Sequence, residues 1–213
     1  MANELIRPFD EESAKAIQEA AKFLSKLVEA GAGVGHYLDR IFGRVPDNLV
    51  GYLGGDWLLE HRVRNAERLR AETEQIRRRR GTQETADISP SVAIPLVQAA
   101  IDEDREGLRE LWAKLLANAM DPERTHLVRP TLINLLKKLD PLDARALQQM
   151  AEAPMGPPGD IADALSKRLG ISRDEAFFSI EHLYELGCLD HSPSNFPFPR
   201  VSAKGRLLIQ SVT

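Results

Sequence analysis

The sequence of 213 residues lacks features that define several large classes of protein. Its one cysteine, Cys188, rules out an internal disulfide framework and a set of thiolate metal ligands. The longest uncharged, mostly apolar stretch, Ile88 to Ile101, falls short of the roughly 20 residues of a membrane helix and is broken by Pro90 and Pro95. Met1 to Glu12 has no basic region followed by an apolar one, as a secretory signal would. These absences predict a cytoplasmic protein that is not integral to a membrane.

The sequence also lacks the residue patterns of common active sites. The five histidines are scattered, and no HExxH, GxSxG or Cys/His ligand spacing is present. Cys188 follows a helix-ending glycine in an apolar context, which favours a core position over a nucleophile. The three carboxylates Asp102–Asp104 could bind a metal ion, but carboxylates at the start of a helix more often serve its dipole. We therefore expect no enzyme activity, no cofactor and no metal ion.

The sequence also lacks a strong excess of charge of one sign. It has 28 Lys and Arg and 32 Asp and Glu, which gives a net charge of −4. This balance excludes a strongly basic coat protein but not a local basic patch. Eight arginines lie in the helix expected over 56–80, which ends on Arg77, Arg78, Arg79 and Arg80. These four are candidates for an anion or nucleic-acid contact. The alternative, a solvated helix end with Glu–Arg pairs, is favoured.

Helical periodicity dominates the first 152 residues. An amphipathic helix is expected from Glu11 to Ala30, followed by a glycine-rich segment over 31–55 and the long basic helix over 56–80. The apolar seam of that long helix, from Leu59 to Ile76, predicts a helix partner within the chain or across a homodimer. Residues 1–152 are therefore predicted to form an all-α helical bundle.

Further helices are expected after this seam. One begins at Ser89-Pro90, with the serine as cap, and another carries Trp112 and Leu115 on a broad apolar face. Helices from 130 to 139 and from Asp140-Pro141 complete the bundle. Four residues are candidates for structural anchors of the core or of an interface: Trp57, Trp112, Leu115 and Phe177.

A Pro/Gly segment over 153–159 predicts a linker, and residues 160–213 follow a different pattern. A helix capped by Asp160, a turn at 170–172 and a second helix precede a short strand over 188–191 and a return strand over 200–202. A last helix spans 203–210. This order is typical of a winged helix, so the predicted fold is mostly α, with a C-terminal winged-helix-like α+β unit.

The charge of this unit disfavours DNA reading. Ser172 to Asp190, which covers the expected recognition helix, holds one cation, Arg173, against five carboxylates. The wing adds Arg200 as a further candidate contact. Because phosphate neutralisation supplies most non-specific affinity for DNA, we favour a protein-docking module and keep nucleic-acid binding as the alternative.

Three blocks of sequence resemble the Abi-alpha (abortive infection alpha) family of bacterial phage-defence proteins. They are GYLGGDW at 51–57, LRELWAKLLANAMDP at 108–122 and TLINLLKKLDPLDA at 131–144. The similar span covers roughly residues 30 to 150. The resemblance implies a role in abortive infection, in which an infected bacterium stops growing or dies before the phage matures. It transfers no catalytic residue.

Together these observations predict a non-enzymatic antiphage protein that acts through contacts with a phage or host protein, as sensor or effector. The alternative is a winged-helix transcription regulator. A membrane-perturbing toxin, acting through the glycine-rich segment, is a weaker alternative because charged residues such as Asp39, Arg40 and Arg44 interrupt that segment.

Overall fold

The described part of the chain is mostly helical, as the periodicity predicts. A computed structural model describes residues 56–82, 84–86, 88–152, 161–190 and 200–213. The expected helix over 11–30 and the glycine-rich segment over 31–55 lie outside these residues. The chain divides into two compact units, residues 1–70 and residues 71–213. The predicted linker at 153–159 also lies outside the described residues, and the division does not fall there.

The long basic helix is confirmed as α4, Asp56–Arg80, with arginines filling its last turn. Gly81 follows it at φ 71°, a left-handed conformation that glycine adopts without strain. Only the first part of α4, residues 56–70, is described in the first unit. Of the predicted apolar seam, Leu69 and Thr73 are buried.

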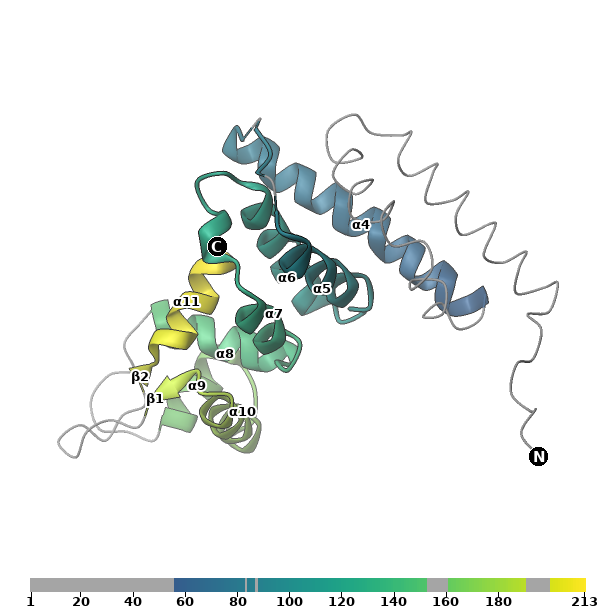
Figure 1. Ribbon diagram of the computed structural model, residues 1–213. Helices are drawn as coiled ribbons and strands as arrows, with labels where there is room; N and C mark the ends of the chain where they lie inside the picture. The colour runs from purple at the N-terminus through teal and green to yellow at the C-terminus, as the bar shows by residue number, and fades with distance from the viewer. Residues whose placement is uncertain (1–55, 83, 87, 153–160, 191–199) are drawn as a thin grey trace, which may run out of the picture. The chain divides into compact units, whose positions relative to one another are not determined.

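The second unit continues with seven α-helices and one 3₁₀ helix among the described residues (Figure 1). They are α5 (Pro90–Ile101), α6 (Glu106–Met120), η1 (Thr125–Leu127), α7 (Pro130–Leu136), α8 (Pro141–Glu152), α9 (Ile161–Leu169), α10 (Arg173–Glu185) and α11 (Ala203–Ser211). Strands β1 (Leu189–Asp190) and β2 (Arg200–Val201) pair antiparallel, with Leu189 opposite Val201. Apart from η1, which the sequence analysis did not predict, the positions of these elements agree with the sequence-based expectations to within a few residues.

Helix α6 supplies much of the apolar core. Trp112 and Leu115, both proposed as anchors, are 1% and 0% exposed, and Leu108 and Leu116 are buried beside them. Helix α5 packs against both α6 and α7, and α8 contacts α6, α9 and α10. Burial of each such large side chain stabilises the fold by about 1.5–3 kcal/mol. The apolar face predicted for α6 is therefore the face that is buried in the structure.

Ser89, expected as a helix cap, and Glu103, expected to interact with a helix dipole, both act differently from the expectation. Ser89 stands at the N-cap of α5, but its hydroxyl makes no capping bond and instead lies 2.8 Å from Ser91 Oγ. Glu103 does not serve a helix dipole, because its carboxylate turns inward and is 6% exposed. There it accepts from Arg105 Nε at 2.7 Å and Arg105 Nη2 at 2.8 Å, and Trp112 Nε1 lies 3.4 Å away. The donors of Arg105 and Trp112 draw this carboxylate into the core.

A buried amide joins three helices within the second unit. Asn118 of α6, which is 0% exposed, accepts from Arg80 Nη1 at 2.6 Å and donates from Nδ2 to the Ser211 carbonyl at 2.8 Å. Arg80 Nη2 also donates to the Thr213 carbonyl at 2.7 Å. The ends of α4, α6 and α11 therefore meet at one polar cluster, and each buried polar group of Asn118 has a partner.

Contacts also cross the predicted boundary between the bundle and the C-terminal helices. Asp143 of α8 is 0% exposed, and its Oδ2 accepts from His182 Nδ1 of α10 at 2.7 Å. Helices α9 and α10 both contact α8. These contacts place both sides of the predicted linker in one compact unit, residues 71–213.

Asn118→Ala is expected to lower the free energy of unfolding by about 1–3 kcal/mol, because it leaves the Ser211 carbonyl and one Arg80 N–H without their buried partner. Urea denaturation measures the loss. Asn134→Ala removes an exposed asparagine of α7 and should change stability by less than about 0.5 kcal/mol. Equal effects of the two substitutions would show that the amide cluster does not stabilise the fold.

Glu103→Gln is expected to destabilise the protein at neutral pH, and the effect should disappear in acid. Burial raises the pKa of Glu103, but hydrogen bonds from Arg105 outweigh it and lower this pKa below its usual 4.5. The ionised carboxylate thus stabilises the fold above pH about 4.5, and this contribution is lost as the pH falls through the lowered pKa. Denaturation at pH 7 and pH 3 measures the difference. Asp104→Asn removes a carboxylate at the exposed neighbouring position, and a loss of stability at pH 7 as large as that of Glu103→Gln would refute the assignment.

Candidate functional site

Helix α10 is fixed at both ends by its own sequence. Ser172 Oγ accepts from the Glu175 amide at 3.2 Å, and the Ser172 amide donates to Glu175 Oε2 at 2.8 Å, which forms a capping box. Ser172 Oγ also lies 2.7 Å from Glu175 Oε2, and the hydrogen bonds that the Ser172 hydroxyl and amide donate to this carboxylate lower the pKa of Glu175. At the other end Gly187 takes φ 69°, and the Cys188 amide donates to the Leu183 carbonyl at 2.8 Å. The helix therefore begins and ends at defined residues.

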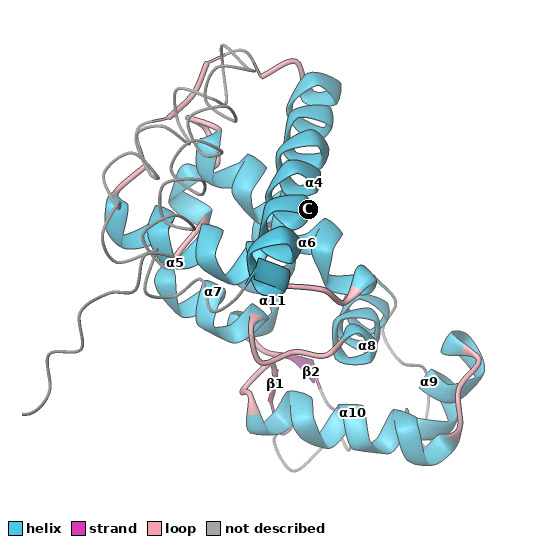
Figure 2. Ribbon diagram, turned by 90° about the vertical axis from the view of Figure 1, so that its right-hand side faces the viewer, coloured by secondary structure: helices cyan, strands magenta, loops and turns pink. Residues whose placement is uncertain are grey.

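The inner side of α10 packs on α8 and α9. Ala176 and Leu183 are 0% exposed, and Ile180 and Ser179 are also buried. His182 anchors this side through its bond to Asp143. Figure 2 shows α10 along the edge of this group of helices, so that its other side is not covered by them.

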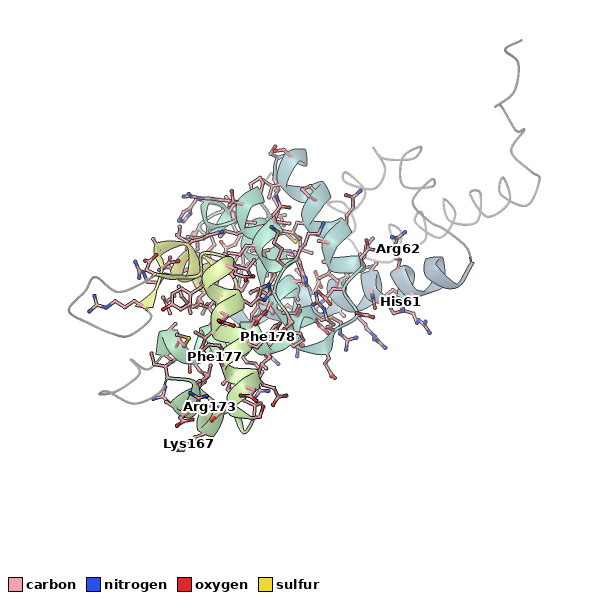
Figure 3. All side chains as sticks on the ribbon, turned by 90° about the horizontal axis from the view of Figure 1, so that it is seen from below. His61, Arg62, Lys167, Arg173, Phe177 and Phe178 are labelled. Atoms are coloured by element: carbon pink, nitrogen blue, oxygen red, sulfur yellow. The ribbon has the colours of Figure 1, made fainter. Side chains whose placement is uncertain are left out.

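The outer side of α10 carries two adjacent phenylalanines. Phe177 is 48% exposed and Phe178 is 65% exposed, the largest exposures of large apolar side chains among the described residues. Figure 3 shows both on α10. Since Phe178 also stacks on His182, with ring centroids 6.5 Å apart and planes at 30°, it is held against the helix. An exposed aromatic pair on a positioned helix is typical of an interaction surface.

Three carboxylates share the exposed side of α10 with this pair of phenylalanines. At about 100° per residue, an arc of about 100° on α10 holds five side chains, all of them exposed. They are Asp174, Phe177, Phe178, Glu181 and Glu185, and we call them the acidic–aromatic face. No cation stands within this face. Arg173, at its margin, forms an ion pair with Asp163 of α9, with Nε and Oδ1 3.2 Å apart.

The structure does not bring the six candidate arginines together at one contact. Arg173 starts α10, and Arg200 lies exposed on β2, opposite Asp190 in the strand register. Both therefore stand beside carboxylates of neighbouring elements.

The four arginines at the end of α4 have different surroundings. Arg77 is 7% exposed and donates to the Glu84 carbonyl at 3.0 Å and to Thr85 Oγ1 at 2.8 Å. Arg80 holds Asn118, and burial, together with the nearby Arg124, lowers its pKa. Arg78 pairs with Glu74 at 2.7 Å, and Arg79 is exposed. Two of the four thus serve the fold, and a third is neutralised.

Phe177, a third proposed anchor, is exposed. Ala176, Ile180 and Leu183 turn inward and place Phe177 on the outer side of α10. The side chain of Trp57, a further proposed anchor, lies outside the described residues. Sequence reasoning missed Phe178. Two adjacent helical residues point about 100° apart, so the FF pair itself signals that one ring leaves the apolar stripe.

Cys188 is a core residue with 0% exposure. Burial raises the pKa of its thiol to about 11, the nearby carboxylate of Asp143 adds to the rise, and Lys204 opposes it. A thiol of this kind is protonated at neutral pH and is a poor nucleophile. Over the described residues, no group of three or more His, Cys, Asp or Glu could hold a metal ion.

Membrane insertion finds no support in the described helices, none of which combines the length and the apolar character that crossing a bilayer requires. The residues suggested for a membrane contact, within 31–55, are outside the described part of the chain.

Residues 64–200 match the family described as abortive infection alpha. The matched span includes the two blocks at 108–122 and 131–144. The match begins later than the span of about 30 to 150 expected from the resemblance and extends through α10 to β2. Comparisons with curated proteins and with solved structures found no significant match.

Arg77→Ala is expected to lower the free energy of unfolding by about 1–3 kcal/mol, because the Glu84 carbonyl and the Thr85 hydroxyl lose a charged donor. Arg79→Ala, two residues along the same helix end, should change it by less than about 0.5 kcal/mol. Urea denaturation of both variants tests the assignment. A loss of stability in the Arg79 variant as large as that in the Arg77 variant would contradict it.

Proposed function

The chain belongs to the abortive infection alpha family, and on this premise we propose that it acts in antiphage defence by binding a protein partner, without catalysing a reaction. In abortive infection the infected bacterium stops growing or dies before the phage matures. The chain would act there in the cytoplasm as a sensor of infection or as the effector that follows it. The partner is a phage or host protein.

The exposed pair Phe177 and Phe178 carries this proposal. Elsewhere in the described residues the large apolar side chains are covered to a greater extent. Burying one such ring against a partner yields about 1.5–3 kcal/mol, and aromatic residues are enriched among those that dominate binding energy. Since the capping box and the contacts with α8 and α9 hold α10 in place, little order would have to be gained on binding.

We propose that α9, α10, the β1–β2 pair and α11 act as a winged-helix-like docking module. The order helix, turn, helix, strand, strand, helix supports this assignment. In a DNA-reading winged helix the second helix enters the major groove. Here that helix is α10, and its outer side carries three carboxylates and two phenylalanines. Its charge supports a protein partner.

The second candidate function, a DNA-binding regulator, is favoured by the same order of elements. It must place Asp174, Glu181 and Glu185 next to phosphates, which repels the duplex. The cations available nearby, Arg173 and Arg200, stand beside Asp163 and Asp190. Binding of duplex DNA at low salt, lost in Arg200→Glu, would favour this function over protein docking.

The double variant Phe177→Ala, Phe178→Ala is expected to lose protection against a phage that the wild-type chain resists, while its free energy of unfolding falls by less than about 1 kcal/mol. The reason is loss of the apolar contact with the partner. Plaque counts on bacteria expressing each variant measure protection, and urea denaturation measures stability.

Two matched variants complete this test. Lys137→Ala, Lys138→Ala also truncates two adjacent exposed residues and should protect like the wild type. Phe177→Leu, Phe178→Leu retains apolar side chains and should protect more than the alanine variant. Full protection by the alanine variant would exclude α10 as the docking surface.

A further inference from the structure

We propose that the acidic–aromatic face of α10 binds a cationic amphipathic helix of the partner protein. This inference rests on the proposed function and adds the chemistry of the partner. The observation is the composition of the face, in which three carboxylates and two phenylalanines share one exposed arc without a cation.

Charge complementarity identifies the partner's polar residues. Along the axis of α10, Asp174 precedes the two rings and Glu181 and Glu185 follow them, so docking the rings brings these carboxylates into the interface. Like charges on the partner would oppose binding there, whereas Lys or Arg forms favourable pairs and steers association. The nearby Arg173 does not supply this charge, because it lies at the margin and is paired with Asp163.

The spacing of the face identifies the partner's shape. Asp174 and Glu181 are seven residues apart and Glu181 and Glu185 four, which corresponds to about 10.5 Å and 6 Å along α10. Phe177 and Phe178 lie between the first two. A second helix lying along α10 would match this pattern with cations seven and four residues apart and apolar residues between them, as in helix-to-helix packing.

The same residues disfavour the other occupants. The carboxylates repel the phosphates of DNA and the surface of an anionic membrane. A symmetric pair of α10 helices would place the acidic–aromatic face against itself, carboxylates against carboxylates. A second copy could bind only by offering a different surface, such as the arginine-rich helix α4.

Direct binding to designed helical peptides tests this inference on the full chain. The basic probe is a fluorescein-labelled peptide of about 21 residues with Lys and Leu in the spacing above. An acidic probe has Glu in place of each Lys, and a third probe has the basic composition in scrambled order. Fluorescence anisotropy gives the Kd of each, at two salt concentrations, with duplex DNA of equal length as a further arm.

The basic probe should bind, more weakly as salt is raised, while the acidic probe, the scrambled probe and DNA should bind at least about tenfold more weakly. Two variants should each weaken the basic probe by about tenfold or more: Phe177→Ala, Phe178→Ala and Glu181→Lys, Glu185→Lys. Glu84→Lys, Glu123→Lys makes the same change in net charge at exposed residues elsewhere and should bind like the wild type.

Several results would overturn the inference. One is failure of the basic probe to bind, and another is binding of the acidic probe, the scrambled probe or DNA with the same Kd as the basic probe. Equal losses of affinity for the basic probe in the Glu181/Glu185 and Glu84/Glu123 variants would also overturn it. If sedimentation shows that the wild-type chain self-associates and that the Phe177/Phe178 variant does not, the occupant of this face is a second copy of the chain and not a partner helix. If the basic probe fails while that variant still loses phage protection, the docking surface stands and only the partner's chemistry is wrong.

Discussion

The placement of α10 depends on one interaction, the hydrogen bond between His182 of this helix and the buried carboxylate of Asp143. Its Oδ2 accepts hydrogen bonds from the Asp140 amide, just before α8, at 3.0 Å and from His182 Nδ1 of α10 at 2.7 Å, while the Asp143 amide donates to Asp140 Oδ1 at 2.8 Å. A carboxylate with 0% exposure is costly without such partners. The bond fixes which side of α10 turns inward, and Phe177, Phe178 and the acidic residues are exposed as a result.

Arginines illustrate why the composition of a segment is a poor guide to its role. The run 77–80 is the densest positive charge in the sequence, yet Arg77 and Arg80 are used to hold the chain after α4 and the ends of α6 and α11. Guanidinium groups suit this purpose because they donate several hydrogen bonds in fixed directions. The surface that we propose for docking lies instead on α10, a helix of net negative charge.

Local signals in the sequence predicted the elements but not the contacts between them. Gly81, Gly187 and Ser172 mark the ends of α4 and α10 because they determine backbone conformation locally. The pair Asp143–His182 is 39 residues apart, and Arg80–Asn118 is 38 apart, so no local pattern reveals either. The same limit explains Glu103, whose burial follows from donors that only the folded chain assembles. It also explains Phe177, since its exposure depends on how α10 is rotated against α8 and α9.

The burial of the single cysteine has a consequence for its reactivity. Cys188 is buried just before β1, and Gly205 packs so closely on its carbonyl that a β-carbon added there would lie 2.4 Å from that oxygen. A protonated, enclosed thiol is shielded from oxidants and alkylating agents. The thiol of the folded chain is therefore expected to react slowly with oxidants, and faster labelling of Cys188 would report opening of this part of the fold.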